Sequence, residues 1–326
     1  MGFATTAETQ PVLPVKAAQL TDERAPLEPA ALHGNYGAMI GVDWGTSSFR
    51  AVRLRGRAVV DRRDLPLGIL RVPAGGFADA LRDAIAPWLA DGETRVLVSG
   101  MAGSRQGWRE APYLPCPAGA AALAAGLMVV PFEGAEVRIV PGLVVPGDPP
   151  EVMRGEETQV VGALDGIGRD GLACLPGSHS KWVAVQDGAV AGFSTHLTGE
   201  AFAALRDHTI LGRMVQPGAA PDLDCFDRGV ARAGQAGGLL HHLFGVRTLG
   251  LFDRLANPES YLSGLLIGHE VRAAMPVGQA VHLIGDARLC ALYARAVAAC
   301  GGRATVAGTD AAAAGLALIG EHAGWT

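Results

Sequence analysis

Residues 39–54, MIGVDWGTSSFRAVRL, decide the fold. The apolar run 39–43 leads into the turn GTSS, and the alternating run 49–54 follows that turn. A third run, RAVVDRR at 57–63, comes after one more short turn. Short apolar or alternating runs separated by turn residues are typical of antiparallel strands. The sequence therefore predicts a three-stranded meander at the start of the folded chain.

The same order of elements occurs twice. After the first three strands, the pattern predicts a helix, a strand, a helix and a strand at 77–89, 95–99, 119–127 and 137–140. The second half predicts three strands at 172–176, 181–186 and 189–194. A helical array at about 199–274 follows, and then strand, helix, strand and helix at 281–285, 287–299, 303–308 and 311–319. This alternation indicates a layered α/β protein with two related units.

Length and composition agree with this interpretation. A chain of 326 residues exceeds most single cores, and 49% apolar against 18% charged residues, with 45 glycines, is typical of a compact, turn-rich α/β protein. The formal net charge of -5 provides no basic field to attract a polyanion. Nucleic acid is therefore not an expected partner.

The chain shows no sign of secretion or of membrane insertion. Its five cysteines are widely spaced and odd in number, which predicts reduced thiols. The longest apolar stretch, 118–130, is shorter than the roughly 20 residues that span a bilayer, and no secretory signal pattern is present. We expect a cytoplasmic protein without a membrane partner. Residues 1–38 lack helical or strand periodicity and predict a flexible N-terminal extension.

Asp43 stands at the end of the first strand, directly before the turn. Gly45 allows a close backbone approach to a phosphate, and Thr46 and Ser47 offer hydroxyl and backbone donors. Asp43 supplies the carboxylate that a Mg²⁺–ATP complex needs, through metal-bound water. An ordinary hairpin with the aspartate in an Asx turn is the alternative, because so short a motif is common.

The corresponding turn of the second unit is LPGSHSKW, residues 175–182. Gly177 and Ser178 can donate to a phosphate, Lys181 adds a cation, and His179 lies between two serines. The segment is not a Walker A loop, because its lysine follows a serine and the segment leads into a strand. It predicts a second phosphate-binding turn in which the backbone supplies the donors.

A pair of glutamates, Glu156 and Glu157, lies between the two units in the segment MRGEETQ at 153–159. Carboxylates at a helix N-terminus are stabilised by the helix dipole, which is the ordinary reason to find them there. A carboxylate in this place can also take a proton from an attacking hydroxyl. The pair is therefore a candidate for general-base chemistry.

Several uncommon short sequence motifs follow one another along the chain. They are SGMAGS at 99–104, GW at 107–108, APY at 111–113, MRGEETQ, LPGSHSKWV, LTGE at 197–200 and LSGLLIGHEV at 262–271. In identity and order they resemble the 2-dehydro-3-deoxygalactonokinase family over residues 39–320. The two-fold repeat resembles the plan of the actin-like ATPase and sugar-kinase superfamily.

The resemblance implies two ribonuclease-H-like domains with a nucleotide cleft between them. We expect an N-terminal substrate domain at 39–155 and a C-terminal nucleotide domain at 156–326 that carries the helical insertion. The implied activity is ATP-dependent phosphorylation, with Mg²⁺, of the 6-hydroxyl of 2-dehydro-3-deoxy-D-galactonate in galactonate catabolism. Such kinases hold their general base at the start of an interdomain helix, for which Glu157 is the first choice and Glu156 the second.

The substrate that the resemblance implies is a keto-deoxy sugar acid, whose carboxylate needs a partner. Arg105 and Arg154 stand beside segments that are expected to face the cleft, and a guanidinium is well suited to a carboxylate. Ser104, Trp108 and Tyr113 would add hydrogen bonds and a flat apolar wall. Each of these residues has an ordinary structural role in other settings.

The adenosine of ATP is expected against two strand-to-helix loops, at Gly285, Asp286 and Gly308, where ordinary helix caps are the alternative. Two other functions stay open. One is a kinase for another acid, such as the gluconate epimer or pantothenate, and the other is a non-catalytic nucleotide-dependent sensor. A hydrolase is disfavoured, because the G-x-S-x-G and H-E-x-x-H motifs are missing. Homodimerisation is left open.

Overall fold

The computed structural model describes residues 37–215, 218–308 and 310–325. These described residues belong to one compact unit. The expected N-terminal extension lies outside the described residues up to position 36. Strand β1 begins at Ala38, one residue before the predicted start of the fold.

The first sheet contains the predicted meander. Strands β1 (Ala38–Trp44), β2 (Phe49–Arg55) and β3 (Ala58–Leu65) are antiparallel, with β1 paired to β2. Strand β1 is also parallel to β4, which in turn is parallel to β7. The sheet order is β3-β2-β1-β4-β7-β6, with β4, β7 and β6 at Arg95–Gly100, Glu136–Ile139 and Met128–Val130. The prediction of three successive antiparallel strands is confirmed.

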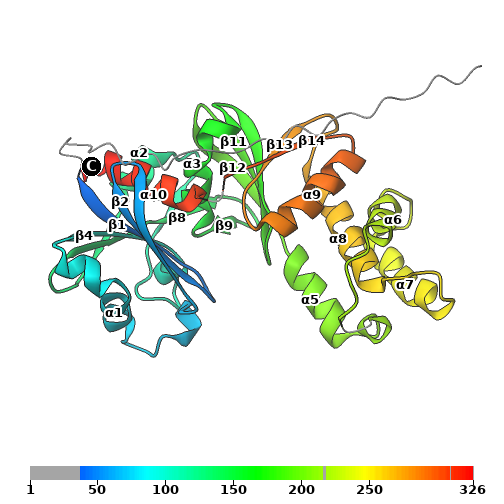
Figure 1. The fold of residues 1–326 in the computed structure, drawn as a ribbon. Coiled ribbons are helices and arrows are strands. Elements are labelled where there is room, and N and C mark those ends of the chain that lie inside the picture. The colour runs from blue at the N-terminus through cyan, green and yellow to red at the C-terminus, as the bar shows by residue number, and fades with distance from the viewer. Residues whose placement is uncertain (1–36, 216–217, 309, 326) are drawn as a thin grey trace, which may run out of the picture. The chain divides into compact units, whose positions relative to one another are not determined.

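The second sheet repeats the strand order of the first. Its order is β12-β11-β10-β13-β14, in which β10, β11 and β12 are again an antiparallel meander and β10 is parallel to β13. The strands occupy Gly171–Leu175, Ser180–Gln186, Ala189–His196, Ala280–Leu283 and Arg303–Val306 for β10 to β14. Figure 1 shows the two sheets and the helices that cover them.

A third, small sheet was not predicted. It has the order β5-β8-β9, with strands at Tyr113–Pro115, Gly142–Val145 and Glu151–Met153. Runs of three or four residues show too few alternations to be recognised as strands. The sheet matters for the site, because β9 leads directly into Arg154 and β5 begins with Tyr113.

The helices follow the predicted alternation. Helices α1, α2, α3 and α4 are Phe77–Ala90, Ala120–Ala125, Glu156–Gly162 and Leu164–Ile167. The predicted helical array contains α5 to α8, at Thr198–His208, Leu223–Ala233, Gly238–Leu251 and Pro258–Ala274. Helices α9 and α10 are Ala287–Ala299 and Ala311–His322, and three 3-10 turns, η1, η2 and η3, lie at Ile69–Arg71, Met101–Gly103 and Gly212–Met214. In the described part of the chain, no helix has the length and apolar character needed to cross a membrane.

The two faces of the first sheet have different partners, as strand alternation requires. Ile40 and Val42 of β1 pack with α1 in one apolar cluster. Met39 of β1 instead packs with Leu316 and Ile319 of α10 in a second cluster. The last helix of the chain therefore covers one face of the first sheet.

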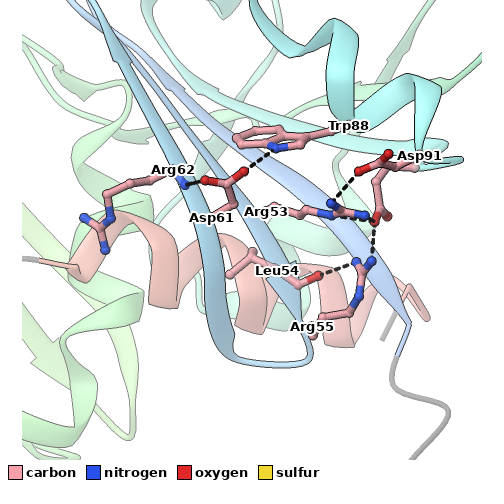
Figure 2. Close-up of polar contacts among 8 residues, drawn as sticks. Arg53, Leu54, Arg55, Asp61, Arg62, Trp88 and Asp91 are labelled. Carbon is pink, nitrogen blue, oxygen red and sulfur yellow. Dashed lines mark hydrogen bonds and ion pairs between the residues drawn. The ribbon is translucent and has the colours of Figure 1, made fainter. Parts of the chain in front are cut away.

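Polar contacts fix α1 against the strands of the first sheet (Figure 2). The indole of Trp88 donates to Asp61 of β3, with 2.8 Å between Nε1 and Oδ2. Arg53 of β2 donates to Asp91 and to Glu93, both at 2.8 Å. Because Glu93 is 4% exposed, its charge needs these donors in place of water. The contacts hold the end of α1 to the sheet that carries the first glycine turn.

Helices α3 and α10 approach each other at two glycines. A Cβ atom on Gly162 would lie 1.9 Å from the carbonyl oxygen of Ala311, and one on Gly315 would lie 1.9 Å from that of Thr158. Neither backbone oxygen can move without moving its helix. The close contact of the two helices therefore depends on glycine at both positions, because glycine has no side chain.

We expect Gly162→Ala to destabilise the protein by about 1–3 kcal/mol, because the methyl group forces α3 and α10 apart. The melting temperature should fall by at least several degrees. Gly192→Ala is the control, because a Cβ atom at Gly192 has no neighbour within 4 Å. Equal melting temperatures for the two variants would contradict the close contact.

Candidate active site

Three backbone segments meet at Asp43. Strands β1 and β4 are parallel and end side by side, with Trp44 opposite Gly100. A Cβ atom on Gly100 would lie 2.7 Å from the oxygen of Trp44 and 3.3 Å from Oδ1 of Asp43. A Cβ atom on Gly155 would lie 3.0 Å from Cα of Gly100. Both glycines have a positive φ, so the contact of β1, β4 and the start of α3 requires glycine there.

The carboxylate of Asp43 is weakly neutralised. Its nearest cation is Arg50, at 3.8 Å, and its side chain is 18% exposed. Burial raises the pKa of Asp43, the charge of Arg50 opposes this, and the nearby Glu156 adds to it. Two acidic groups that repel each other at a strand end favour the arrival of a cation.

The turn that contains Gly45 is held by hydrogen bonds to the segment after β3. The backbone N–H of Ile69 donates to the oxygen of Gly45 at 3.0 Å, and the indole of Trp44 donates to Leu67 at 2.7 Å. Thr46 and Ser47 are exposed at the tip of the turn. The structure therefore leaves the predicted hydroxyl and backbone donors free to meet a ligand.

The second turn is exposed at Ser178 and His179. His179 pairs with Glu200 of α5, Nε2 to Oε2 at 2.5 Å. A Cβ atom on Gly177 would meet nothing within 4 Å, so the backbone of the turn is open on that side. These predicted phosphate-binding residues lie together at one strand end.

Lys181 is directed elsewhere. Its Nζ donates to the oxygen of Val152 and to Oγ1 of Thr195, both at 2.9 Å. Burial lowers its pKa, while the charges of Glu156 and Glu151 oppose that shift. The lysine joins β11 to β9 and β12, and the charge of Glu156 of α3 acts on it.

The two glutamates differ in access. Glu157 is fully buried, accepts from the backbone N–H of Gly155 at 2.7 Å and from Thr158 Oγ1 at 3.1 Å. Burial, with the charge of Glu156, raises the pKa of Glu157 to about 7. Glu156 is only half-buried and acts electrostatically on Asp43, Lys181 and Glu157. Glu156 is therefore the more accessible of the two carboxylates.

Arg154 is a buried cation beside these groups, and among the described residues it has no anionic partner. Arg154 is 8% exposed, and its Nη2 donates to the oxygen of Ala111 at 2.7 Å. Its Nε and Nη1 are buried and have no hydrogen-bond partner among the described residues, and the same holds for Oγ of Ser104. The guanidinium lies over the ring of Tyr113, with 4.2 Å between Cζ and the ring centroid. Unpaired donors of this kind are costly to bury and mark a place for an acceptor.

Two other predicted substrate residues have ordinary partners in the structure. The side chain of Arg105 is 86% exposed and pairs with Glu110 at 3.2 Å. Trp108 packs edge-on against Phe132, with ring centroids 6.3 Å apart. Of the two candidate arginines, Arg154 alone presents buried, unpaired donors.

The predicted adenosine loops border a cavity of about 450 Å³ together with Asp43. Gly285, Asp286 and Gly308 line it. Asp286 caps α9, since its Oδ1 accepts from the backbone N–H of Leu289 at 3.0 Å. The loops therefore act as helix caps and also face the cavity that contains the end of β1.

A second cavity, of about 470 Å³, was missed from the sequence. It lies beside Gly177 of the second turn, and its apolar lining includes Phe202 of α5, Leu266 of α8 and Tyr293 of α9. Ser260 and Ser263 add hydroxyls. The signal for it was the mixture of small, hydroxyl and apolar residues in α8, but that pattern is also ordinary for a packed helix.

The repeated strand order and the glycine turns at the ends of β1 and β10 define the class. That class is a mixed α/β fold in which two sheets share one strand order. The chain belongs to the 2-keto-3-deoxy-galactonokinase family, whose model matches residues 43–319.

Three known proteins are similar to it. A Rhizobium meliloti (strain 1021) protein, provisionally named 2-dehydro-3-deoxygalactonokinase DgoK1, is 37% identical over 80% of this chain and 89% of its own length. The 2-dehydro-3-deoxygalactonokinase of Escherichia coli (strain K12) is 34% identical over 86% and 96%. A crystal structure of a Sinorhizobium meliloti protein, provisionally assigned the same activity, aligns with a TM-score of 0.78 at 36% identity, covering 87% of this chain and 98% of that one. The resemblance drawn from the motifs is confirmed.

Proposed function

We propose that this protein is an ATP-dependent kinase that phosphorylates the 6-hydroxyl of 2-dehydro-3-deoxy-D-galactonate. The observation that carries the proposal is the buried guanidinium of Arg154, which has two unpaired donors and no carboxylate partner among the described residues. A sugar acid brings the missing carboxylate. The hydroxyl of Ser104 would donate a hydrogen bond to the same carboxylate. The ring of Tyr113 would stack against the guanidinium.

The acceptor hydroxyl is proposed to meet Glu156. A general base must come within hydrogen-bond reach of the proton it takes, and Glu156 has the access that Glu157 lacks. Lys181 lies near Glu156, and the two opposite charges attract each other. Glu157 was the first choice from sequence, and that assignment stays a prediction; its burial favours a supporting role.

The nucleotide is proposed to lie between two ribonuclease-H-like domains. The exposed turns at Gly45 and Gly177 would hold its phosphates, and the cavity of about 470 Å³ beside Gly177 would take the base. From the sequence, the adenosine was expected at Gly285, Asp286 and Gly308, which line the other cavity, and that assignment stays a prediction. The cavity lined by Gly285 and Asp43 would then admit the phosphates and the acceptor side of the site.

The acidic groups at this strand end fit Mg²⁺. Asp43 offers carboxylate oxygens as metal ligands, and the nearby charge of Glu156 makes a cation more favourable there. The described residues contain no cluster of three metal-ligating side chains. Asp43 would therefore hold the metal together with the phosphates of ATP. The ion would neutralise the charge of the transferred phosphoryl group.

ADP release coupled to a detection enzyme should show turnover with 2-dehydro-3-deoxy-D-galactonate and little with pantothenate or simple aldonic acids. Every acid in this panel can offer a carboxylate to Arg154, so turnover depends on whether the rest of the molecule fits and brings its hydroxyl to Glu156 at the same time. The gluconate epimer is the closest competitor in the panel. If none of the acids in the panel is turned over, the chain would be a nucleotide-dependent sensor, and the proposal would be contradicted.

A further inference from the structure

A buried carboxylate lies in the C-terminal half of the chain, outside the proposed chemistry. Glu270 of α8 is 4% exposed. Its Oε1 accepts from the indole of Trp182 at 2.8 Å, and its Oε2 accepts from the hydroxyl of Tyr293 at 2.6 Å. Both donors are neutral, so the side chain is held by hydrogen bonds in a dry core.

The hydrogen bonds have one direction. The hydroxyl of Tyr293 donates its hydrogen bond to Glu270. The hydroxyl oxygen of Tyr293 therefore accepts from Ser180, whose Oγ lies 2.8 Å away. Ser180, Tyr293 and Trp182 are at most 3% exposed. The hydroxyl hydrogen of Ser180 therefore points inward and is not available to a phosphate, in contrast with the exposed Ser178 of the same turn.

The chain of contacts joins two parts of the nucleotide site. Ser180 is the first residue of β11 and directly follows the exposed turn that contains Gly177. The ring of Tyr293 lines the cavity of about 470 Å³. One side chain thus touches the base cavity and, through its hydroxyl, the root of the phosphate-binding turn.

We propose that Glu270 is a positioning residue that fixes the second phosphate-binding turn against the nucleotide cavity through Tyr293 and Ser180. The inference rests on the proposed nucleotide site, but not on the identity of the sugar acid. Trp182 anchors the other oxygen of Glu270, so the carboxylate cannot turn away when the nucleotide enters. The turn is then ordered before ATP binds, and less of the binding free energy is lost in ordering it.

The test is the affinity for adenylyl imidodiphosphate with Mg²⁺, measured by calorimetry without any sugar acid. Tyr293→Phe keeps the ring in the cavity and removes only the link, and it should weaken binding about tenfold. Ser180→Ala should have a similar effect. The double variant should bind no more weakly than the weaker single variant, because both changes break the same link.

Tyr261→Phe is the matched control, since it removes a hydroxyl from another buried tyrosine that lies on α8 outside this network. Its affinity should equal that of the wild type. A Tyr293→Phe affinity within twofold of wild type, or losses that add in the double variant, would overturn the proposal. Melting curves of each variant show whether it is folded.

Variants of Glu270 provide a second measurement. Glu270→Gln keeps the shape: its oxygen can accept from Trp182 and its amide can donate to Tyr293, whose hydroxyl then donates to Ser180. The link is kept with its direction reversed, so this variant should stay within about threefold of wild type, whereas Glu270→Leu should lose at least about tenfold. Equal affinities for these two variants would overturn the positioning role. In kinetics, Tyr293→Phe should raise KM for ATP and leave KM for the sugar acid unchanged. Normal nucleotide binding with no sugar-acid turnover in the wild type would contradict the proposed function alone.

Discussion

Replacing Glu156 with glutamine is expected to lower kcat at least about a hundredfold. Glutamine keeps the size and the start of α3 but cannot accept the proton of the attacking hydroxyl, and general-base catalysis contributes about 10²–10⁴-fold. Affinity for ATP and the melting temperature should change little, because the side chain is half-exposed and its loss leaves no cavity. Steady-state kinetics with the sugar acid and with ATP measures this directly.

Glu157→Gln is the matched control, since it makes the same change one residue later. Its effect on kcat should be milder, but it should alter the pH dependence of stability. The pKa of Glu157 is raised from 4.5 to about 7 in the folded protein, so the protonated form stabilises the fold below pH 4.5 and this stabilisation is lost as the pH rises through 7. The melting temperature of the wild type should therefore fall relative to the variant between pH 5 and 8. A larger loss of kcat in Glu157→Gln than in Glu156→Gln would assign the general base to Glu157. Full activity in both variants would show that neither glutamate takes part in catalysis.

Replacing Arg154 with methionine is expected to raise KM for the sugar acid about a hundredfold, with KM for ATP within about twofold of wild type. Hydrogen bonds to a charged group contribute about 1.5–3 kcal/mol, and two unpaired donors are available here. Arg105→Met is the control, because Arg105 is exposed and paired with Glu110. Its KM values should remain near those of the wild type.

Stability distinguishes a binding arginine from a structural one. A buried charge without an anionic partner costs free energy in the empty protein, so Arg154→Met should leave the melting temperature unchanged or raise it. Saturating sugar acid should then stabilise the wild type much more than the variant. A large loss of stability together with equal effects on both KM values would remove Arg154 from the substrate site.

Local patterns were sufficient for much of the fold. The run MIGVD and the turn GTSS predicted β1 and its turn, because strand alternation and glycine chemistry act within a few residues. The short strands β5, β8 and β9 were missed, since their pairing joins residues far apart in sequence. Local patterns do not contain that information.

The site was predicted less completely, for a related reason. The sequence identified the two turns and Arg154, but it could not show that Lys181 reaches Val152, because side-chain direction depends on which face of β11 meets β9. Its order of Glu157 before Glu156 stays a prediction, and it could not show that the two differ in access although they are neighbours in one helix. The cavity beside Gly177 depends on three helices and was not visible in any one of them.

Helix α10 also determines when the protein can fold during synthesis. Leu316 and Ile319 cover the face of the first sheet that holds Met39, and Arg57 of the loop after β2 pairs with Glu321 at 2.7 Å. Helix α10 is synthesised long after the first sheet, and chains are made at about 5–20 residues per second. The nascent N-terminal half must therefore wait many seconds with one apolar face open. We expect chaperones that bind apolar surface to engage this half during translation, and to release it once α10 has emerged.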